Sequence, residues 1–205
     1  GLSGKWHVGE GEGMQPHQVG YDEFHGFLSV VSEYTQYMDE RKYGQLMLDP
    51  DRLKTFKGLS KYNAVVDGKK GSELKVAYPL DNASQMGNVD QDFANWSIDF
   101  IKRAVEAQKP FYLVHAFAKV HFDNFPGDGY QGRSPAKLPY KDAVVEVDDI
   151  VGRLIAAVGE AGQADNTFVF FTSDNGPCLV RVWHEVGGAH PVHGVGARGR
   201  RSERT

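Results

Sequence analysis

The sequence predicts an α/β fold in which a largely parallel sheet is flanked by helices. Residues 89–108 carry apolar side chains at helical spacing, and the apolar run FYLVHAF follows at residues 111–117. The same order returns downstream, where a helical pattern at residues 141–162 precedes the apolar segment NTFVFFTSD at residues 166–174. Unbroken apolar runs are typical of strands buried on both faces. Because strands connected through helices run parallel, this order predicts a parallel sheet.

The first helix is predicted from a single apolar face. The residues of that face lie three or four positions apart along the chain: Phe93, Trp96, Phe100, Ile101, Ala104 and Val105. Asp90 is the expected N-cap, and Pro110 lies just beyond the expected end of the helix.

The second helix is predicted from an aliphatic stripe with charged side chains outside it. The stripe contains Val144, Val147, Val151, Leu154 and Val158, whereas Asp142, Glu146, Asp149 and Arg153 lie off it. Gly162 is a natural C-terminal stop, because glycine readily adopts the left-handed conformation in which many helices end.

The rest of the chain carries weaker patterns. Residues 1–20 are glycine-rich and polar, so we expect a loop that contributes little to a core. Residues 21–88 mix aromatic side chains with turn signals such as LDPDR and DGKKG, which indicates short helices and long connections. Residues 178–205 are rich in glycine and arginine, and we expect them to add neither a strand nor a helix to the core.

The composition indicates a globular protein and argues against several other classes of protein. The chain has 205 residues, 40% of them hydrophobic, which is enough for one globular domain with a real core. A net charge of −4 gives no indication of a nucleic-acid partner. No run approaches the roughly 18 apolar residues that a membrane span needs. The single cysteine excludes an internal disulfide and leaves the cellular compartment open.

Asp174 and Asn175, in the sequence SDNGP, follow the second apolar run. Ligands of a parallel sheet bind beyond the carboxyl ends of its strands, and carboxylate and amide oxygens suit hard cations such as Ca²⁺ or Mg²⁺. Asp-Asn-Gly is also an ordinary turn sequence, in which both side chains bond to nearby backbone. On spacing alone the turn is the favoured interpretation.

Lys5 and His7 stand two residues apart in GKWHVG, so both lie on one side of the chain if it is extended. A lysine beside a histidine suits the binding of an anion such as sulfate or phosphate, together with proton transfer. The alternative is two solvated side chains around a buried Trp6, and this is favoured when the motif is taken by itself.

The segment HAFAKVHF supplies His115, Lys119 and His121. His115 falls inside an apolar run, so we expect a histidine of the core. His121 follows the predicted strand, where a site would lie, and is the better candidate for a proton donor or a contact with a leaving group. Cys178, the only thiol, has no nearby base in PCLVRV, so we expect it to be inert.

Taken together, these segments resemble the sulfatase family of the alkaline-phosphatase-like superfamily. The resemblance rests on GKWHVG, QVGYDEFHGFL, KPFYLVHAFAKVHF and the stretch from YKDAVVEV to TSDNGP, which occur in the family's order and at about its spacing. It implies an alkaline-phosphatase-like fold, with residues 1–177 as a partial catalytic domain and residues 178–205 as a divergent tail.

By this resemblance the reaction would be the hydrolysis of a sulfate ester by means of a formylglycine and a divalent cation, Ca²⁺ or Mg²⁺. Lys5 would contact sulfate, His7 would help to deprotonate the formylglycine hydrate, and His121 would contact sulfate or assist the leaving group. Asp174 and Asn175 would bind the cation. The expected partner is a sulfate ester, with no nucleic acid and no membrane, and a periplasmic or secreted location is typical of the family.

The sequence also departs from the family pattern. The family makes its formylglycine in a Cys-x-Pro-x-Arg or Ser-x-Pro-x-Arg stretch, and neither occurs in these residues. Val120 stands where a proline is common, and Arg198 is the nearest cation where the family has a lysine. We therefore expect an incomplete domain that is inactive alone. The alternatives are a non-catalytic module that binds a sulfated ligand, a phosphate or phosphonate ester hydrolase of the same superfamily, and a chain that does not fold stably.

Overall fold

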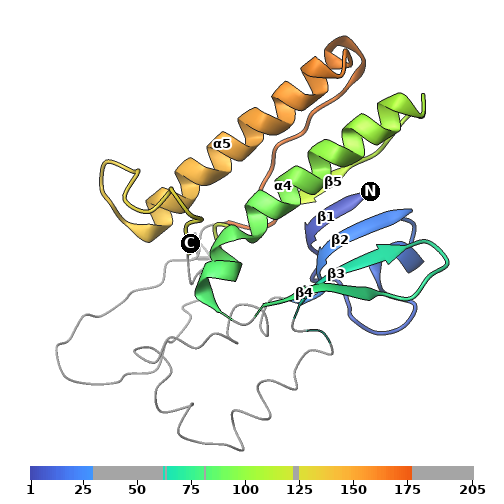
Figure 1. Ribbon diagram of the computed structural model, residues 1–205, viewed down its shortest axis with the longest axis horizontal. Helices are drawn as coiled ribbons and strands as arrows, with labels where there is room; N and C mark the ends of the chain where they lie inside the picture. Colours follow the sequence, from blue (N-terminus) through green and yellow to red (C-terminus); the bar gives the residue numbers. More distant parts are fainter. Residues whose placement is uncertain (30–61, 63, 81, 122–124, 177–205) are drawn as a thin grey trace, which may run out of the picture. The chain divides into compact units, whose positions relative to one another are not determined.

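The structure, a computed structural model, describes residues 1–29, 62, 64–80, 82–121 and 125–176 (Figure 1). It divides the chain into two units, Gly1–Thr167 and Phe168–Thr205. The first unit contains every helix and strand of the described residues. Within those residues, no helix is long and apolar enough to cross a membrane.

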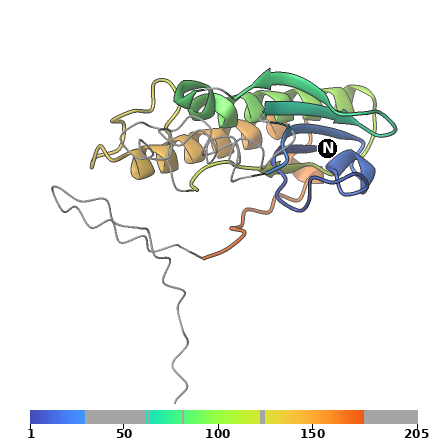
Figure 2. The ribbon, with the colours of Figure 1, turned by 90° about the horizontal axis from the view of Figure 1, so that it is seen from below.

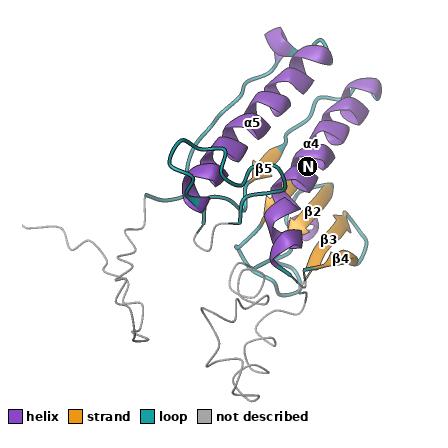
Figure 3. Cartoon of the chain, turned by 60° about the vertical axis from the view of Figure 1, so that its left-hand side comes forward, coloured by secondary structure: helices purple, strands orange, loops and turns teal. Residues whose placement is uncertain are grey.

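The described residues of the first unit form a mixed sheet of five strands in the order β4-β3-β2-β1-β5 (Figure 1), and Figure 3 colours the strands orange. These strands are β1 (Leu2–Lys5), β2 (Glu23–Phe27), β3 (Ala64–Lys69), β4 (Lys75–Pro79) and β5 (Val114–Ala116). β1 pairs in parallel with both β2 and β5, whereas β3 pairs antiparallel with both β2 and β4. The predicted parallel arrangement therefore holds for three strands, and an antiparallel hairpin completes the sheet.

Within the described residues, two long helices accompany the sheet. α4 (Ala83–Glu106) packs on β1, β2 and β5, and α5 (Pro139–Glu160) packs beside α4 (Figures 1 and 2). Two short 3-10 turns, η1 (Pro16–Gln18) and η2 (Ala164–Asn166), lie in the connections.

Apolar side chains are buried on both faces of the sheet, because successive residues of a strand point to opposite faces. The cluster beneath α4 contains Phe27, Val65, Leu80, Met86, Val89, Phe93 and Ala118. The cluster on the other face contains Leu2, Phe24, Leu28, Ala64 and Val66. Burial on both faces fixes the register of the sheet, since a shift by one residue would exchange the two clusters.

The prediction for the first half of the chain was wrong in two places. Residues 1–20 are not only loop, because Leu2–Lys5 forms β1, which lies between β2 and β5. The described part of residues 21–88 contains the strands β2, β3 and β4 in addition to the start of α4, and residues 30–61, 63 and 81 lie outside the described residues. Four residues are too few for a clear pattern, and β1 is stabilised by pairing with strands distant in sequence, which local patterns do not reveal.

The first helix is confirmed, but its start was misplaced. α4 begins at Ala83, and its N-cap is Asn82, whose side chain accepts a hydrogen bond from the Gln85 amide at 2.9 Å. Asp90 lies inside the helix and is fully buried, so it is not the N-cap. The Asn82 carboxamide satisfies an amide of the first turn, which is the property that makes a residue an N-cap.

The second helix is confirmed, together with its C-terminal stop. Gly162 has a φ of +69°, and the Gln163 amide donates to the Val158 carbonyl at 3.0 Å, the bond that closes a Schellman motif. The predicted apolar stripe was wrong in part. Val144 is exposed, whereas Asp142 and Glu146 are buried. The buried face is partly polar because these carboxylates accept backbone hydrogen bonds from the preceding loop.

The two apolar runs were predicted to be buried strands, and both predictions need correction. The first contributes only Val114–Ala116, which is partly buried and forms one edge of the sheet. The second is not a strand: its residues 168–171 are between 60% and 92% exposed, and no described strand pairs with them. An apolar run becomes a strand only where another strand meets its backbone groups.

Candidate active site

Lys5 lies at the end of one strand, and His121 lies beyond the end of the neighbouring parallel strand. In the register of β1 and β5, Leu2 lies opposite Val114 and Gly4 opposite Ala116. Lys5 is the last residue of β1, and His121 lies five positions beyond the end of β5. Both chain segments therefore leave the sheet at the same edge, which is where ligands of parallel sheets bind.

Glycine allows these strands to approach closely. Gly4 has a φ of +105°, and a Cβ at this position would overlap the carbonyl oxygen of Ala116. Gly26 of β2 shows the same closeness on the other side, because a Cβ there would overlap the carbonyl oxygen of Gly4. The GKWH motif thus begins at a backbone position where a larger residue does not fit.

His7 lies just beyond β1 in an unusual backbone conformation. The Trp6 and His7 amides donate to the carbonyls of Phe27 and Leu28, each at 3.0 Å, so the chain still follows β2 after Lys5. His7 is exposed and has a φ of +52°, which is uncommon for a residue other than glycine. Strained backbone of this kind is frequent at functional sites.

Trp6 fixes the loop that follows His7. Its indole Nε1 donates to the carbonyls of Gly9 and Met14, at 2.9 and 3.0 Å. Its ring also meets the Tyr21 ring edge-on, with centroids 6.1 Å apart. Trp6 is partly buried and stands between Lys5 and His7, so its contacts hold the backbone that carries both residues.

Lys119 has a buried ammonium group. Its side chain is 6% exposed, and Nζ lies 3.2 Å from Asp90 Oδ2 and 3.1 Å from Glu146 Oε2. Nζ also donates to the Gly87 carbonyl at 2.8 Å. These contacts place the lysine between α4 and α5 as a structural cation two residues before His121.

His115 agrees only in part with the prediction of a core histidine, because the residue is partly buried. Its Nδ1 lies 2.9 Å from the hydroxyl of Ser97, and its ring packs edge-on against Phe117. Burial lowers the pKa of His115 to about 4, so the ring is neutral at physiological pH. Nε2 is buried without a hydrogen-bond partner among the described residues.

Asp174 and Asn175 belong to the second unit, and both are exposed. The Ser173 hydroxyl donates to the Asn175 carbonyl at 2.7 Å, and Asn175 Nδ2 donates to the Gly176 carbonyl at 2.8 Å. The segment therefore has the local bonds of a turn. The bond of Asn175 uses the amide nitrogen, whereas a cation would bind the amide oxygen, so the turn and the metal-ligand interpretations are compatible.

The donors of this segment fit a hard cation but do not complete a site. One carboxylate and one amide oxygen match the ligand preference of Ca²⁺, which takes six to eight oxygens. Across the described residues, no group of three His, Cys, Asp or Glu side chains is arranged to hold a metal ion. Cys178 and Arg198 lie outside the residues that the structure describes.

Two polar clusters of the structure were not predicted from the sequence. One is the group of Lys119 with Asp90 and Glu146. In the other, the ring nitrogens of His25 lie 2.7 Å from Asp67 and 2.8 Å from Asp92. The sequence does indicate that the two helical carboxylates are buried. Asp90 is three or four residues from the apolar positions 86 and 93, and Glu146 is three or four residues from positions 143 and 150, so each lies on the apolar face of its helix.

Charge and burial act against each other at His25. Burial opposes charging of the ring, but the hydrogen bonds to Asp92 and Asp67 outweigh it and raise the pKa of His25 above its usual value. The Tyr78 hydroxyl donates to the same Asp92 at 2.6 Å. The cluster therefore ties β2, β3, β4 and α4 together, and it is a structural feature of the sheet.

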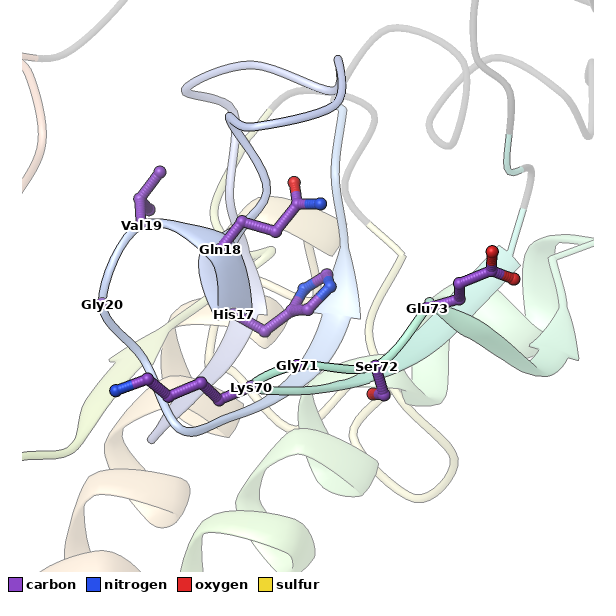
Figure 4. Close-up of a pocket in the computed structure, with 8 residues that line it drawn as sticks. All are labelled: His17, Gln18, Val19, Gly20, Lys70, Gly71, Ser72 and Glu73. Atoms are coloured by element: carbon purple, nitrogen blue, oxygen red, sulfur yellow. The ribbon is translucent and has the colours of Figure 1, made fainter.

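Two surface hollows formed by described residues have no contribution from Lys5, His7 or His121. One, of about 670 Å³, lies between η1 and the β3–β4 turn (Figure 4). His17 lines it, and both ring nitrogens of His17 are buried without a partner among the described residues. The other, of about 680 Å³, adjoins His25 and Trp96.

Comparison with known proteins decides the family. The family model described as Sulfatase matches residues 1–199. The chain belongs to the sulfatase family. N-acetylgalactosamine-6-sulfatase from Mus musculus is 29% identical over 190 residues, which cover 93% of this chain and 33% of that protein. Arylsulfatase A from Bos taurus is 29% identical over 187 residues, which cover 90% of this chain and 34% of that protein.

Solved sulfatase structures confirm the predicted fold. The crystal structure of PsFucS1 sulfatase from Pseudoalteromonas sp. superposes with a TM-score of 0.75 at 47% sequence identity, covering 80% of this chain and 33% of that one. The mixed sheet with its two helices is thus part of an alkaline-phosphatase-like α/β domain. This sulfatase chain spans about a third of the length of the relatives it matches.

Proposed function

We propose that these residues form part of a sulfuric ester hydrolase and that Lys5, His7 and His121 act on the sulfate group. The main support is the sulfatase family match across residues 1–199. The exit of the Lys5 and His121 segments from adjacent parallel strands at one edge of the sheet is consistent with it. A shared edge is what a common binding site for these side chains would require.

Each side chain has a role that its chemistry suits. The Lys5 ammonium would bind sulfate oxygens and oppose the negative charge that develops on them. His7 would accept a proton at its imidazole, and the exposure of this residue gives water and substrate access. His121 would bind sulfate or donate a proton to the oxygen of the departing alcohol.

Asp174 and Asn175 would hold a divalent cation, Ca²⁺ or Mg²⁺, with their carboxylate and amide oxygens. When bound, such a cation supplies positive charge against the sulfuryl oxygens. We propose that the remaining cation ligands and the formylglycine lie outside these 205 residues, so that the chain alone is inactive. The support is the share of the relatives that it spans, about a third.

The test is a comparison of aryl sulfate with aryl phosphate as substrates. A form of the protein that spans the full length of its relatives should hydrolyse the aryl sulfate with the higher kcat/KM, and the 205-residue chain should hydrolyse neither. Preference for the phosphate would indicate a phosphate ester hydrolase. Binding of a sulfated saccharide without hydrolysis by the longer form would indicate a non-catalytic module.

A further inference from the structure

Carboxylates from two helices hold the chain segment that carries His121, and the buried ammonium of Lys119 contacts both of them. Asp90 of α4 accepts from two successive backbone amides of the segment, Ala118 at 2.7 Å and Lys119 at 3.1 Å. Glu146 of α5 accepts from the Gly127 amide at 2.8 Å, on the far side of His121. The two carboxylates thus hold the backbone both before and after this histidine.

Lys119 makes this arrangement electrostatically favourable. Asp90 and Glu146 are each fully buried, and two carboxylates in one buried space repel each other. The ammonium of Lys119 lies within 3.2 Å of both. Nζ donates hydrogen bonds to Asp90 and to the Gly87 carbonyl, and it forms an ion pair with Glu146. The ammonium therefore reduces the repulsion between the two carboxylates, and removing it would leave them facing each other without a cation.

The contacts also explain why Lys119 does not act on substrate. Its side chain is 6% exposed, so the ammonium cannot reach a ligand at the edge of the sheet without leaving two buried carboxylates. Breaking a buried ion pair by removing one partner is unfavourable, because it leaves an uncompensated charge. The lysine is therefore fixed in the interior, and its influence on the site passes through the backbone.

We propose that Lys119 is a positioning residue that fixes His121 for the reaction by holding Asp90 and Glu146 together. The role of His121 rests on the proposed function, whereas the anchoring of the backbone does not. Lys119→Met keeps the aliphatic part of the side chain and removes the charge. Lys119→Arg restores the charge, and Lys141→Met makes the same change at an exposed lysine of α5.

The experiment combines amide hydrogen exchange with NMR of the His121 ring in the full 205-residue chain. In Lys119→Met, protection of the Ala118, Lys119 and Gly127 amides should fall at least about tenfold while the middle of α4 and α5 stays protected. The His121 ring signal should move toward that of an unstructured histidine. Lys119→Arg should restore part of both effects, and Lys141→Met should change neither.

Glu146→Gln provides a second, milder variant, because glutamine keeps the shape and an accepting oxygen but loses the charge. It should produce the same local effects in weaker form. An unchanged His121 signal in Lys119→Met overturns the proposal, even if the amides exchange faster. Loss of protection throughout the chain in both Lys119→Met and Glu146→Gln also overturns it, because the network would then support the whole unit.

The same variants separate this inference from the proposed function in a form with sulfatase activity. Lys119→Met should lower kcat with little change in KM, and Lys119→Arg should recover part of the loss. An enzyme without activity toward aryl sulfate but with the expected exchange pattern contradicts the proposed function and leaves the anchoring intact. Full kcat in Lys119→Met contradicts the positioning role.

Discussion

Gly4 and Ala116 face each other across the parallel strands β1 and β5, so closely that a Cβ at Gly4 would overlap the Ala116 carbonyl oxygen. This contact sets the spacing of the two segments that lead to Lys5 and His121. The backbone between the two segments therefore leaves no room for a side chain at this position, and the site depends on a glycine that has no chemistry of its own.

Gly4→Ala should destabilise the first unit by about 2–4 kcal/mol, because it adds overpacking to a strained φ. Gly13→Ala is the matched control. Gly13 also has a positive φ, of +80°, but a Cβ there would meet nothing within 4 Å. The control should cost only about 1 kcal/mol in urea unfolding. Equal losses for the two variants would show that β1 and β5 can separate freely.

His25 should give the first unit a stability that declines as the pH rises. Its folded-state pKa is raised because the hydrogen bonds to Asp92 and Asp67 outweigh the cost of burial. The stabilisation is fully present below the unfolded pKa of about 6.5 and is lost as the pH rises through the folded pKa. In urea unfolding between pH 5.5 and 9, the stability difference between wild type and His25→Gln should shrink with rising pH. A difference that grows with pH would contradict the ion-pair geometry.

His115 should make the first unit less stable as the pH falls. Burial lowers its pKa to about 4, so the unfolded chain binds a proton more readily than the folded one. Its contribution is present above the unfolded pKa of about 6.5, and roughly 3 kcal/mol is lost as the pH falls to 4. In urea unfolding, His115→Leu should reduce this loss of stability at acid pH, whereas His7→Ala, at an exposed histidine, should leave the loss unchanged. The same loss of stability in His115→Leu as in wild type would show that the ring is not buried as neutral imidazole.

The 205-residue chain should bind Ca²⁺ weakly, with a Kd of about 1 mM, because Asp174 and Asn175 supply too few oxygens. Calorimetric titration should show this binding in wild type and lose it in Asp174→Asn. Asp165→Asn, which removes another exposed carboxylate nearby in sequence, is the control. Equal weakening of Ca²⁺ binding by both variants would mean that binding depends only on the net charge of the chain.

The sequence predicted the structure correctly where the spacing of apolar residues directly reflects their packing. The existence of α4 and α5 and the stop at Gly162 all follow from local residue types. It was insufficient where tertiary contacts override local preference. β1 is recognised only through its partners, and Glu146 is an acidic residue on a buried face that pairs with Lys119 from another element.

The candidate site could be predicted only in part for a similar reason. Motif spacing gives residue types, and the parallel register of β1 and β5 gives the common edge at which the Lys5 and His121 segments leave the sheet. The anchoring of that edge by Asp90 has no motif, since its contacts are to backbone amides that have the same chemistry in every sequence. The joint action of Lys5 with Asp174 remains a prediction.

The most direct test is the hydrolysis of an aryl sulfate by a form of the protein that spans the full length of its sulfatase relatives. Lys5→Ala and His7→Ala should each lower kcat/KM at least about 100-fold, and Lys109→Ala, at an exposed lysine, should leave it unchanged. Removal of divalent cations with a chelator should abolish hydrolysis, and added Ca²⁺ should restore it. Hydrolysis that persists without Lys5 and His7, or no hydrolysis of sulfate esters by the wild-type enzyme, would contradict the account.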